Sequence, residues 1–196
     1  MRNYSSLVFL LLVFPVISLG QEHSRPAART EPPPPAARTA PEPGSWIRYE
    51  SVEGRYSVLL PKKPTFTTQE ATTADGVKFP QYMANSTSEK AVCLTGYFDQ
   101  VEGTVFNFDN ARDGMVKAVK GTLSREAPIS LDGYEGREFL VSANLNGTDA
   151  LFRVRIYKVQ TRIYVLQFIS EKGSESEALV KDSRKYFDSF TPVAAP

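Results

Sequence analysis

Apolar and polar residues alternate along the stretch from Gly136 to Ser170, and this period of two predicts three antiparallel strands joined by two tight turns. Asn146-Gly147 lies between two apolar and β-branched runs. Both central positions of a type I′ turn need a positive φ, which asparagine and glycine adopt readily, so this dipeptide predicts a two-residue hairpin turn. We take this meander as the centre of the fold.

The turn fixes the register of the first two strands. It places Phe139 opposite Val154 and Glu138 opposite Arg155. Apolar residues occupy every second position of both strands and therefore share one face, which is predicted to be core. They are Phe139, Val141, Ala143, Phe152, Val154 and Ile156. The other face is mixed and partly exposed to water, and Glu138 and Arg155 can form a cross-strand ion pair there.

The third strand, Arg162 to Ile169, is apolar on both faces, and we expect it to be the most buried strand. A turn at Gln160-Thr161 would place Tyr157 opposite Tyr164. Beyond it, Ser174-Glu175-Ser176-Glu177 has the form of a capping box, which predicts the start of a helix.

Thr191-Pro192 ends that helix. Its apolar stripe can pack on the sheet, and it consists of Ala178, Leu179, Tyr186, Phe187 and Phe190.

The residues before the meander predict further strands and one helix. Pro80 indicates an edge strand or a bulge. The expected strands are Arg55 to Leu60, Thr65 to Thr73, Val77 to Asn85, Lys90 to Phe98 and Thr122 to Leu131, with a helix from Asn107 or Asp109 to about Lys120. The fold class is therefore α+β, an antiparallel sheet of about six to eight strands packed with two main helices.

Three segments are expected along the 196 residues. Residues 1–20 resemble a cleavable secretory signal, with Arg2 before an apolar run and cleavage near Gly20. Residues 21–45 are predicted to be a disordered, proline-rich tether, and residues 46–192 a single α+β domain. The apolar run is shorter than the roughly 20 residues of a membrane span, which favours a secreted or periplasmic location over a membrane anchor.

Charge and residue usage exclude several classes of function. Removal of Arg2 with the signal leaves 22 basic and 22 acidic residues, so nothing indicates binding to nucleic acid or to an anionic membrane. His23 is the only histidine and lies in the tether, which removes histidine-based triads and histidine-rich metal sites from the domain. We therefore assign no catalytic, metal-binding or cofactor-binding residue and expect no enzyme activity.

Cys93 is the only cysteine, so no intramolecular disulfide can form. It lies in the middle of a predicted strand with no basic neighbour to lower its pKa. We interpret it as a small buried apolar residue rather than as a nucleophile or redox thiol.

Three patches carry a resemblance to a known family. They are Gly54-Arg55-Tyr56-Ser57-Val58-Leu59-Leu60-Pro61 with Pro64, Gly133-Tyr134-Glu135-Gly136-Arg137-Glu138-Phe139, and Tyr186-Phe187-Asp188-Ser189-Phe190. Together they resemble bacterial PsbP-like envelope domains. The resemblance implies an α/β/α sandwich around an antiparallel sheet, over about residues 46–192, and a role in binding partners rather than in catalysis.

One surface is a candidate for a partner. Arg153 and Arg155, beside Tyr157 and Tyr164, could bind an anion or a partner protein on the mixed face of the sheet. The alternative, which we favour, is a helix that covers this face and leaves the arginines paired at its rim.

The leading functional hypothesis is an exported, non-enzymatic module that binds an envelope protein or complex. The second hypothesis is a carrier of a small ligand or lipid, held between the sheet and its helices. A hydrolase that uses carboxylates ranks third. The sequence leaves the oligomeric state open.

Overall fold

The computed structural model describes residues 46–72 and 76–193, and these residues form ten strands and two helices. In chain order the elements are β1 (Ile47–Ser51), β2 (Tyr56–Leu60), β3 (Thr65–Thr72), β4 (Lys78–Thr87), β5 (Ala91–Asp99), α1 (Phe108–Ala118), β6 (Thr122–Leu131), β7 (Tyr134–Leu145), β8 (Thr148–Val159), β9 (Arg162–Glu171), α2 (Glu177–Asp188) and β10 (Thr191–Pro192).

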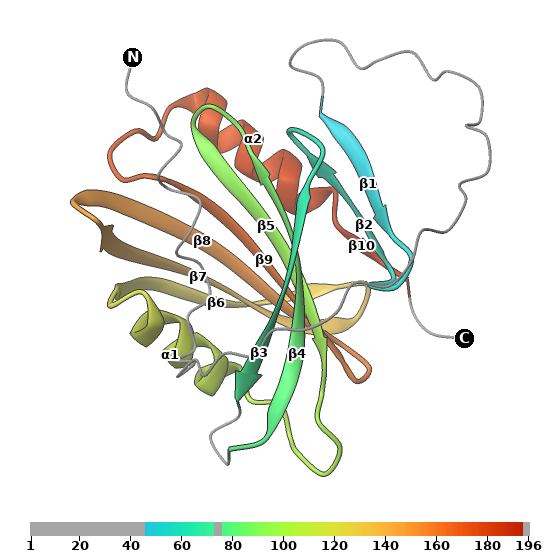
Figure 1. The fold of residues 1–196 in the computed structure, drawn as a ribbon. Helices are drawn as coiled ribbons and strands as arrows, with labels where there is room; N and C mark the ends of the chain where they lie inside the picture. The colour runs from blue at the N-terminus through green and yellow to red at the C-terminus, as the bar shows by residue number, and fades with distance from the viewer. Residues whose placement is uncertain (1–45, 73–75, 194–196) are drawn as a thin grey trace, which may run out of the picture.

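The strands form two antiparallel sheets. Seven of them make the main sheet in the order β3-β4-β5-β9-β8-β7-β6, and the small sheet has the order β1-β2-β10. Figure 1 shows the main sheet as a strongly twisted layer with α1 and α2 packed against it. This arrangement confirms the α+β class and the antiparallel sheet with two main helices.

Each face of the main sheet has its own core. On one face, α2 and the small sheet cover β5, β9 and β8, and the buried side chains include Tyr56, Leu166 and Tyr186. On the other face, α1 packs on β7 and β8 through residues such as Phe108 and Met115. The sheet is thus the middle layer of a sandwich, and its central strands are covered on both faces.

The predicted register of the meander is confirmed. Phe139 pairs with Val154, and Glu138 with Arg155. Asn146 and Gly147 have φ values of 52° and 88°, as a type I′ turn requires. The less regular turn at Gln160-Thr161 also lies where the sequence places it.

β9 is the most deeply buried long strand, as its two apolar faces predict. It lies between β5 and β8 in the middle of the main sheet, and eight of its ten residues are buried. A helix or a second sheet is therefore needed on each side of it.

Both helices begin at the predicted caps. The side chain of Asn107 accepts a hydrogen bond from the backbone N–H of Asn110 at 2.9 Å. Ser176 Oγ accepts one from the backbone N–H of Leu179 at 3.2 Å. Each bond satisfies one of the amides that the first turn of a helix leaves without an intrahelical partner.

Two strands are absent from the sequence prediction. β1 was not expected, and its residues are only intermediate or exposed, so its apolar signal is weak. β10 forms where Thr191-Pro192 was expected only to end α2, and these two residues pair with Ser57 and Tyr56. Arg55, expected to open the first strand, has a φ of 53° and lies in the turn before it.

The prediction that Pro80 marks an edge strand or a bulge is wrong, because β4 has a neighbour on each side and a regular register with β3. β4 is an inner strand, but its pairing with β5 begins only at Tyr82. Pro80 pairs with Glu70 of β3 on one side and lies beyond that β4–β5 ladder on the other. A proline can occupy this position because it is outside the second ladder.

The predicted signal and tether, residues 1–45, lie outside the described residues. Among the described helices, none is both long enough and apolar enough to cross a membrane.

Tyr186 offers a test of how α2 is fixed to the sheet. Its buried hydroxyl donates to the carbonyl oxygen of Leu94 at 2.7 Å and lies 2.7 Å from Thr95 Oγ1. Replacement of Tyr186 by Phe should lower the free energy of unfolding by about 1–3 kcal/mol, because both buried groups lose their partner. Urea denaturation measures this loss.

Tyr82→Phe is the matched control, since Tyr82 is partly exposed, and it should change stability by less than about 0.5 kcal/mol. Equal stability of the Tyr186→Phe variant and the wild type would contradict the proposed role of this hydroxyl.

Candidate ligand-binding cavity

A cavity of about 680 Å³ lies between α1, the segment 100–107 and the α1-facing side of the main sheet. It follows the part of the sheet that α1 leaves uncovered, on β4, β5, β8 and β9. The apolar side chains that line it are Phe79, Met83, Phe98, Val101, Val105, Phe106, Ala111, Met115, Ala118, Ile156, Ile163 and Val165. Its volume is within the range of about 300–1,000 Å³ that is usual for small-molecule sites.

Small residues keep this space open. Gly96 lies on its floor, and a Cβ at this position would be 3.2 Å from Met83 Cγ. The helix presents Ala111, Gly114 and Ala118 to the cavity. A sheet face with a glycine opposite a helix face with three small residues leaves a gap that larger side chains would fill.

The polar residues that line the cavity are uncharged, apart from one lysine. They are Thr72, Gln81, Tyr82 and Tyr97 on the sheet, Gln100 and Thr104 in the loop, and Asn107 and Asn110 at the start of α1. No carboxylate, histidine or cysteine is among the lining residues in the described part of the chain.

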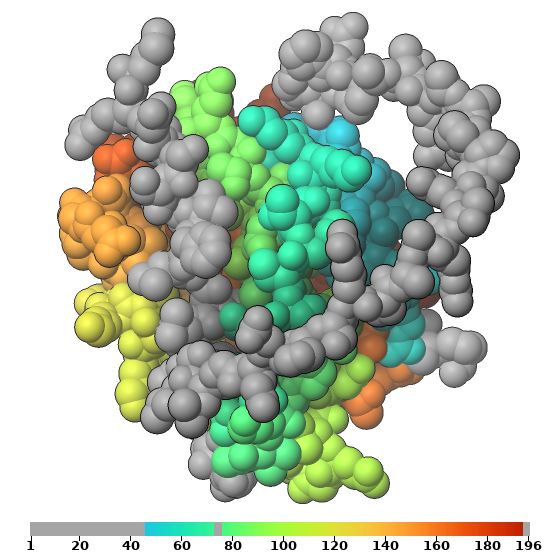
Figure 2. All heavy atoms as spheres, in the orientation of Figure 1, coloured from blue at the N-terminus to red at the C-terminus, as the bar shows by residue number. Residues whose placement is uncertain are grey.

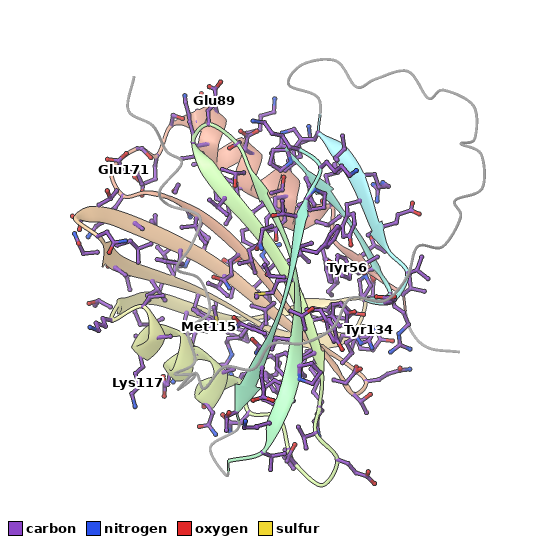
Figure 3. All side chains as sticks on the ribbon, in the orientation of Figure 1. Tyr56, Glu89, Met115, Lys117, Tyr134 and Glu171 are labelled. Carbon is purple, nitrogen blue, oxygen red and sulfur yellow. The ribbon has the colours of Figure 1, made fainter. Side chains whose placement is uncertain are left out.

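The charged group lies away from the sheet. Figure 3 places Met115 on the sheet side of α1 and Lys117 on its outer side. Lys117 is exposed, so its ammonium lies at the rim.

The loop that closes one end is held by local hydrogen bonds. The backbone N–H of Gln100 donates to the carbonyl oxygen of Thr161 at 2.7 Å. Thr104 Oγ1 donates to the carbonyl oxygen of Val101 at 2.7 Å, and Gln100 Nε2 donates to the carbonyl oxygen of Thr104. The wall is therefore preformed.

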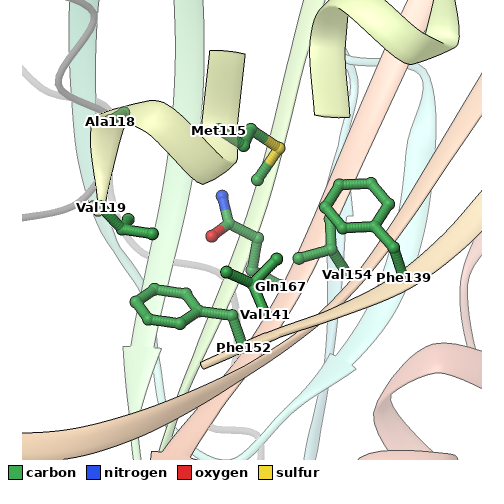
Figure 4. Close-up of a pocket in the computed structure, with 8 residues that line it drawn as sticks. All are labelled: Met115, Ala118, Val119, Phe139, Val141, Phe152, Val154 and Gln167. Carbon is green, nitrogen blue, oxygen red and sulfur yellow. The ribbon is translucent and has the colours of Figure 1, made fainter. Parts of the chain in front are cut away.

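A second, much smaller cavity of about 20 Å³ adjoins the first under α1, and Met115 and Ala118 line both. Gln167 is its only polar lining residue. The Gln167 side chain is 1% exposed, and its Nε2 has no hydrogen-bond partner among the described residues. Figure 4 shows this amide nitrogen directed towards α1, between Met115 and Val119.

An ion cluster fixes α1 to the outer strands. Glu126 of β6 accepts hydrogen bonds from Arg112 of α1 and Arg137 of β7, each at 2.6 Å. Arg112 also pairs with Asp113 at 2.8 Å. The cluster therefore holds the helix over the β6–β7 side, and the β4–β5 side remains open.

The candidate partner surface on the other face is largely covered. Tyr157 and Tyr164 are 3% and 1% exposed, because Phe190 packs on both rings. Arg155 pairs with Glu138 at 2.7 Å, with Asp188 of α2 at 3.1 Å, and lies over the Phe187 ring.

Three of the four candidate residues, Arg155, Tyr157 and Tyr164, thus lie beneath or beside α2 and the segment that follows it. In the structure a helix covers this face of the sheet, as in the alternative that the sequence favoured. Arg153 is half-buried, on the same face two residues from Arg155. A contact between Arg153 and a partner stays a prediction.

Cys93 has the environment that its position predicts. It is buried on β5, and burial, followed by the nearby charge of Asp182, raises the pKa of its thiol. A thiol with a raised pKa is a poor nucleophile.

The cavity was not predicted residue by residue. Ala111 and Met115 recur at a helical spacing of four residues, but that pattern alone indicates a packed core. Gln167 interrupts the run of apolar and aromatic residues from Ile163 to Ile169 within β9, and that interruption is the one signal that could have drawn attention to it.

Similarity to one solved structure supports the fold. The chain resembles cyanobacterial PsbP (CyanoP) from Synechocystis sp. PCC 6803 with a TM-score of 0.54 and 10% identity, over 76% of this chain and 93% of that one. It also matches the Pseudomonas aeruginosa protein PA94, of unknown function, with a TM-score of 0.41 and 10% identity, over 78% and 99% of the two chains. No protein-family model and no curated protein matches the sequence. The fold is PsbP-like.

The ion cluster predicts how stability depends on pH. Burial alone would raise the pKa of Glu126, but hydrogen bonds from Arg137 and Arg112 hold it below its usual range. A carboxylate with a lowered pKa in the folded state stabilises the protein above its unfolded pKa of about 4.3, and that contribution is lost as pH falls through the folded value. Glu126→Gln should thus lower stability by about 1 kcal/mol at pH 7, and the difference from wild type should shrink below about pH 4.

Urea denaturation from pH 3 to 7 measures both effects. Glu135→Gln is the control, because Glu135 is exposed on the same sheet and forms none of the ion pairs of the described residues. A difference that stays constant over this pH range would show that the Glu126 carboxylate does not contribute through its charge.

Proposed function

We propose that this chain is an exported, non-enzymatic binding domain, and that its ligand is a small, mostly apolar molecule held in the cavity between α1 and the main sheet. The preformed cavity of about 680 Å³ carries this proposal. Export rests on the apolar N-terminal run and its cleavage pattern. The small-ligand hypothesis therefore comes before the protein-partner hypothesis, in the reverse of the order that the sequence favours.

The chemistry of the lining defines the ligand. Aromatic and sulfur-containing side chains of the sheet, Phe79, Met83 and Phe98, would contact an apolar body. With Lys117 as the only charged group among the described lining residues, no side chain there can balance a cation. The ligand is thus an uncharged or weakly anionic molecule whose polar groups are few.

The same lining argues against catalysis in the cavity. General acid and base catalysis needs a group that can exchange a proton near neutral pH, and nucleophilic catalysis needs an activated nucleophile. The lining side chains of the described residues include no carboxylate, imidazole or thiol. They suit binding and desolvation of a ligand.

A protein partner is the second candidate, and the free edge of the main sheet at β3 favours it. Six of the eight residues of β3 are exposed, and Phe66 is 62% exposed. β3 lies at the front of the molecule in Figure 2, and the Phe66 ring centroid is 5.7 Å from that of Tyr49 on β1. An edge strand with an exposed aromatic residue and no proline can pair with an extended segment of another protein.

A cavity-filling variant tests the small-ligand proposal. Replacement of Ala111 by Phe places a ring in the cavity, so the fluorescent probe N-phenyl-1-naphthylamine should bind at least about ten-fold more weakly than to wild type. Ala178→Phe is the matched control, because Ala178, which the sequence pattern places in the apolar stripe of α2, is exposed in the structure. Fluorescence titration gives the three dissociation constants.

Two results would overturn the proposal. One is that the wild-type protein does not bind the probe. The other is that Ala111→Phe binds it as tightly as Ala178→Phe does. Native mass spectrometry of protein purified from its host adds a second readout, since a bound small molecule should appear in wild type and be lost in Ala111→Phe.

The partner hypothesis has its own test. Any envelope protein that co-purifies through the β3 edge should be lost when Phe66 is replaced by Ser. It should be retained when Val52, which is 89% exposed in the turn after β1, is replaced by Ser. Retention by both variants would exclude β3 as the contact.

A further inference from the structure

The Gln167 amide lies next to the large cavity, and its nitrogen is buried without a hydrogen-bond partner among the described residues. It lies on β9 in the row of side chains Ile163, Val165, Gln167, of which the first two line the large cavity. Alternate residues of a strand share one face and are about 6.6 Å apart, so the amide lies one step farther under α1. Met115 and Ala118 separate it from the large cavity and line both spaces.

An unpaired amide at this depth is costly. A buried donor without a partner costs about 1–3 kcal/mol, and the large majority of buried side-chain polar atoms in proteins have a partner. The other seven residues that line the small cavity are apolar: Met115, Ala118, Val119, Phe139, Val141, Phe152 and Val154. Nothing in that lining accepts a hydrogen bond through its side chain, apart from the weakly accepting Met115 sulfur.

We infer that Gln167 is the polar anchor of the ligand proposed above, and that this ligand carries an uncharged oxygen, a hydroxyl or a carbonyl, at the end that enters under α1. The inference rests on the proposed function. The N–H of Gln167 would donate to this oxygen while the apolar body of the ligand fills the large cavity. A carboxylate is disfavoured at this end, since the small cavity has no cation to balance it.

Met115 is the flexible side chain between the two spaces, since it lines both. Methionine has three rotatable bonds and adapts its shape to a neighbour at low cost. Its side chain lies on the sheet side of α1 (Figure 3) and next to the Gln167 amide (Figure 4). A change of its rotamer would join the two spaces.

Matched ligands test the inference in the purified full chain. Octan-2-one, octan-1-ol and 1-octene have the same chain length, and each can be assayed by displacement of bound N-phenyl-1-naphthylamine. Gln167→Leu should weaken the binding of octan-2-one and of octan-1-ol by about ten-fold relative to wild type, because one hydrogen bond to the ligand is lost. The same substitution should leave 1-octene unchanged or slightly tighter. Comparison of each ligand with itself removes the differences in ligand solubility.

The stability of the variants gives a second readout. Without ligand, Gln167→Leu and the near-isosteric Gln167→Met should unfold at the same temperature as wild type or higher, because they remove an unpaired buried amide. A marked loss of stability in both would overturn the inference, since it would show a structural hydrogen bond.

The failures of the two proposals are distinguishable. Suppose that the probe and 1-octene bind to wild type, but that Gln167→Leu changes the affinity for all three ligands equally or for none of them. This inference then fails and the proposed function stands. In that case the small cavity, about large enough for one water molecule, would hold a water on the amide. If no ligand displaces the probe from wild type, or the probe does not bind, the proposed function itself fails.

Discussion

The burial of β9 on both faces is the constraint on which the rest of the structure depends. This strand lies in the middle of the main sheet and its alternating side chains enter two separate cores. Side chains such as Leu166 need the cover of α2, and Ile163 and Ile169 need the cover of α1 or its loop. Both helices therefore cover the same strand from opposite faces, although they are far apart in sequence. The two helices differ in how closely they pack. The Tyr186 hydroxyl bonds α2 directly to the sheet, whereas a cavity remains between α1 and the sheet.

Close approach of aromatic rings to backbone explains the motifs behind the PsbP-like resemblance. A Cβ at Gly54 would lie 2.5 Å from the Tyr56 ring, and one at Gly136 would lie 2.6 Å from the ring of Tyr157. The hydroxyl of Tyr164 donates to the carbonyl oxygen of Gly54 at 2.8 Å and so holds the β1–β2 turn on the main sheet. These residues place the small sheet and the end of α2. They determine the fold, and a fold shared at 10% identity does not carry a ligand with it.

Local chemistry accounts for what could be predicted from the sequence. The turn at Asn146-Gly147 determines the pairing of β7 with β8, and Asn107 determines where α1 begins. Both signals can be read from the sequence because each depends on the chemistry of only a few neighbouring residues. β1 and β10 could not be predicted in this way, since they are short, half-exposed strands that depend on contacts with β2. The cavity depends on where α1 lies relative to the sheet. That position is set by the long-range ion cluster around Glu126, for which the sequence has no period or motif.

Stability alone does not explain the combination of residues around the cavity. A larger apolar side chain at Ala111 would fill space and bury more apolar surface, and each methylene buried would contribute about 0.8 kcal/mol. A leucine at position 167 would fit among the apolar neighbours of Gln167 and remove the cost of an unpaired amide, about 1–3 kcal/mol. The chain instead holds α1 over β6 and β7, away from β4 and β5, through the ion cluster around Glu126, and it keeps an unpaired hydrogen-bond donor in the small cavity that adjoins the large one. A ligand that is apolar along its length and has one uncharged oxygen at its tip would offset both costs at once.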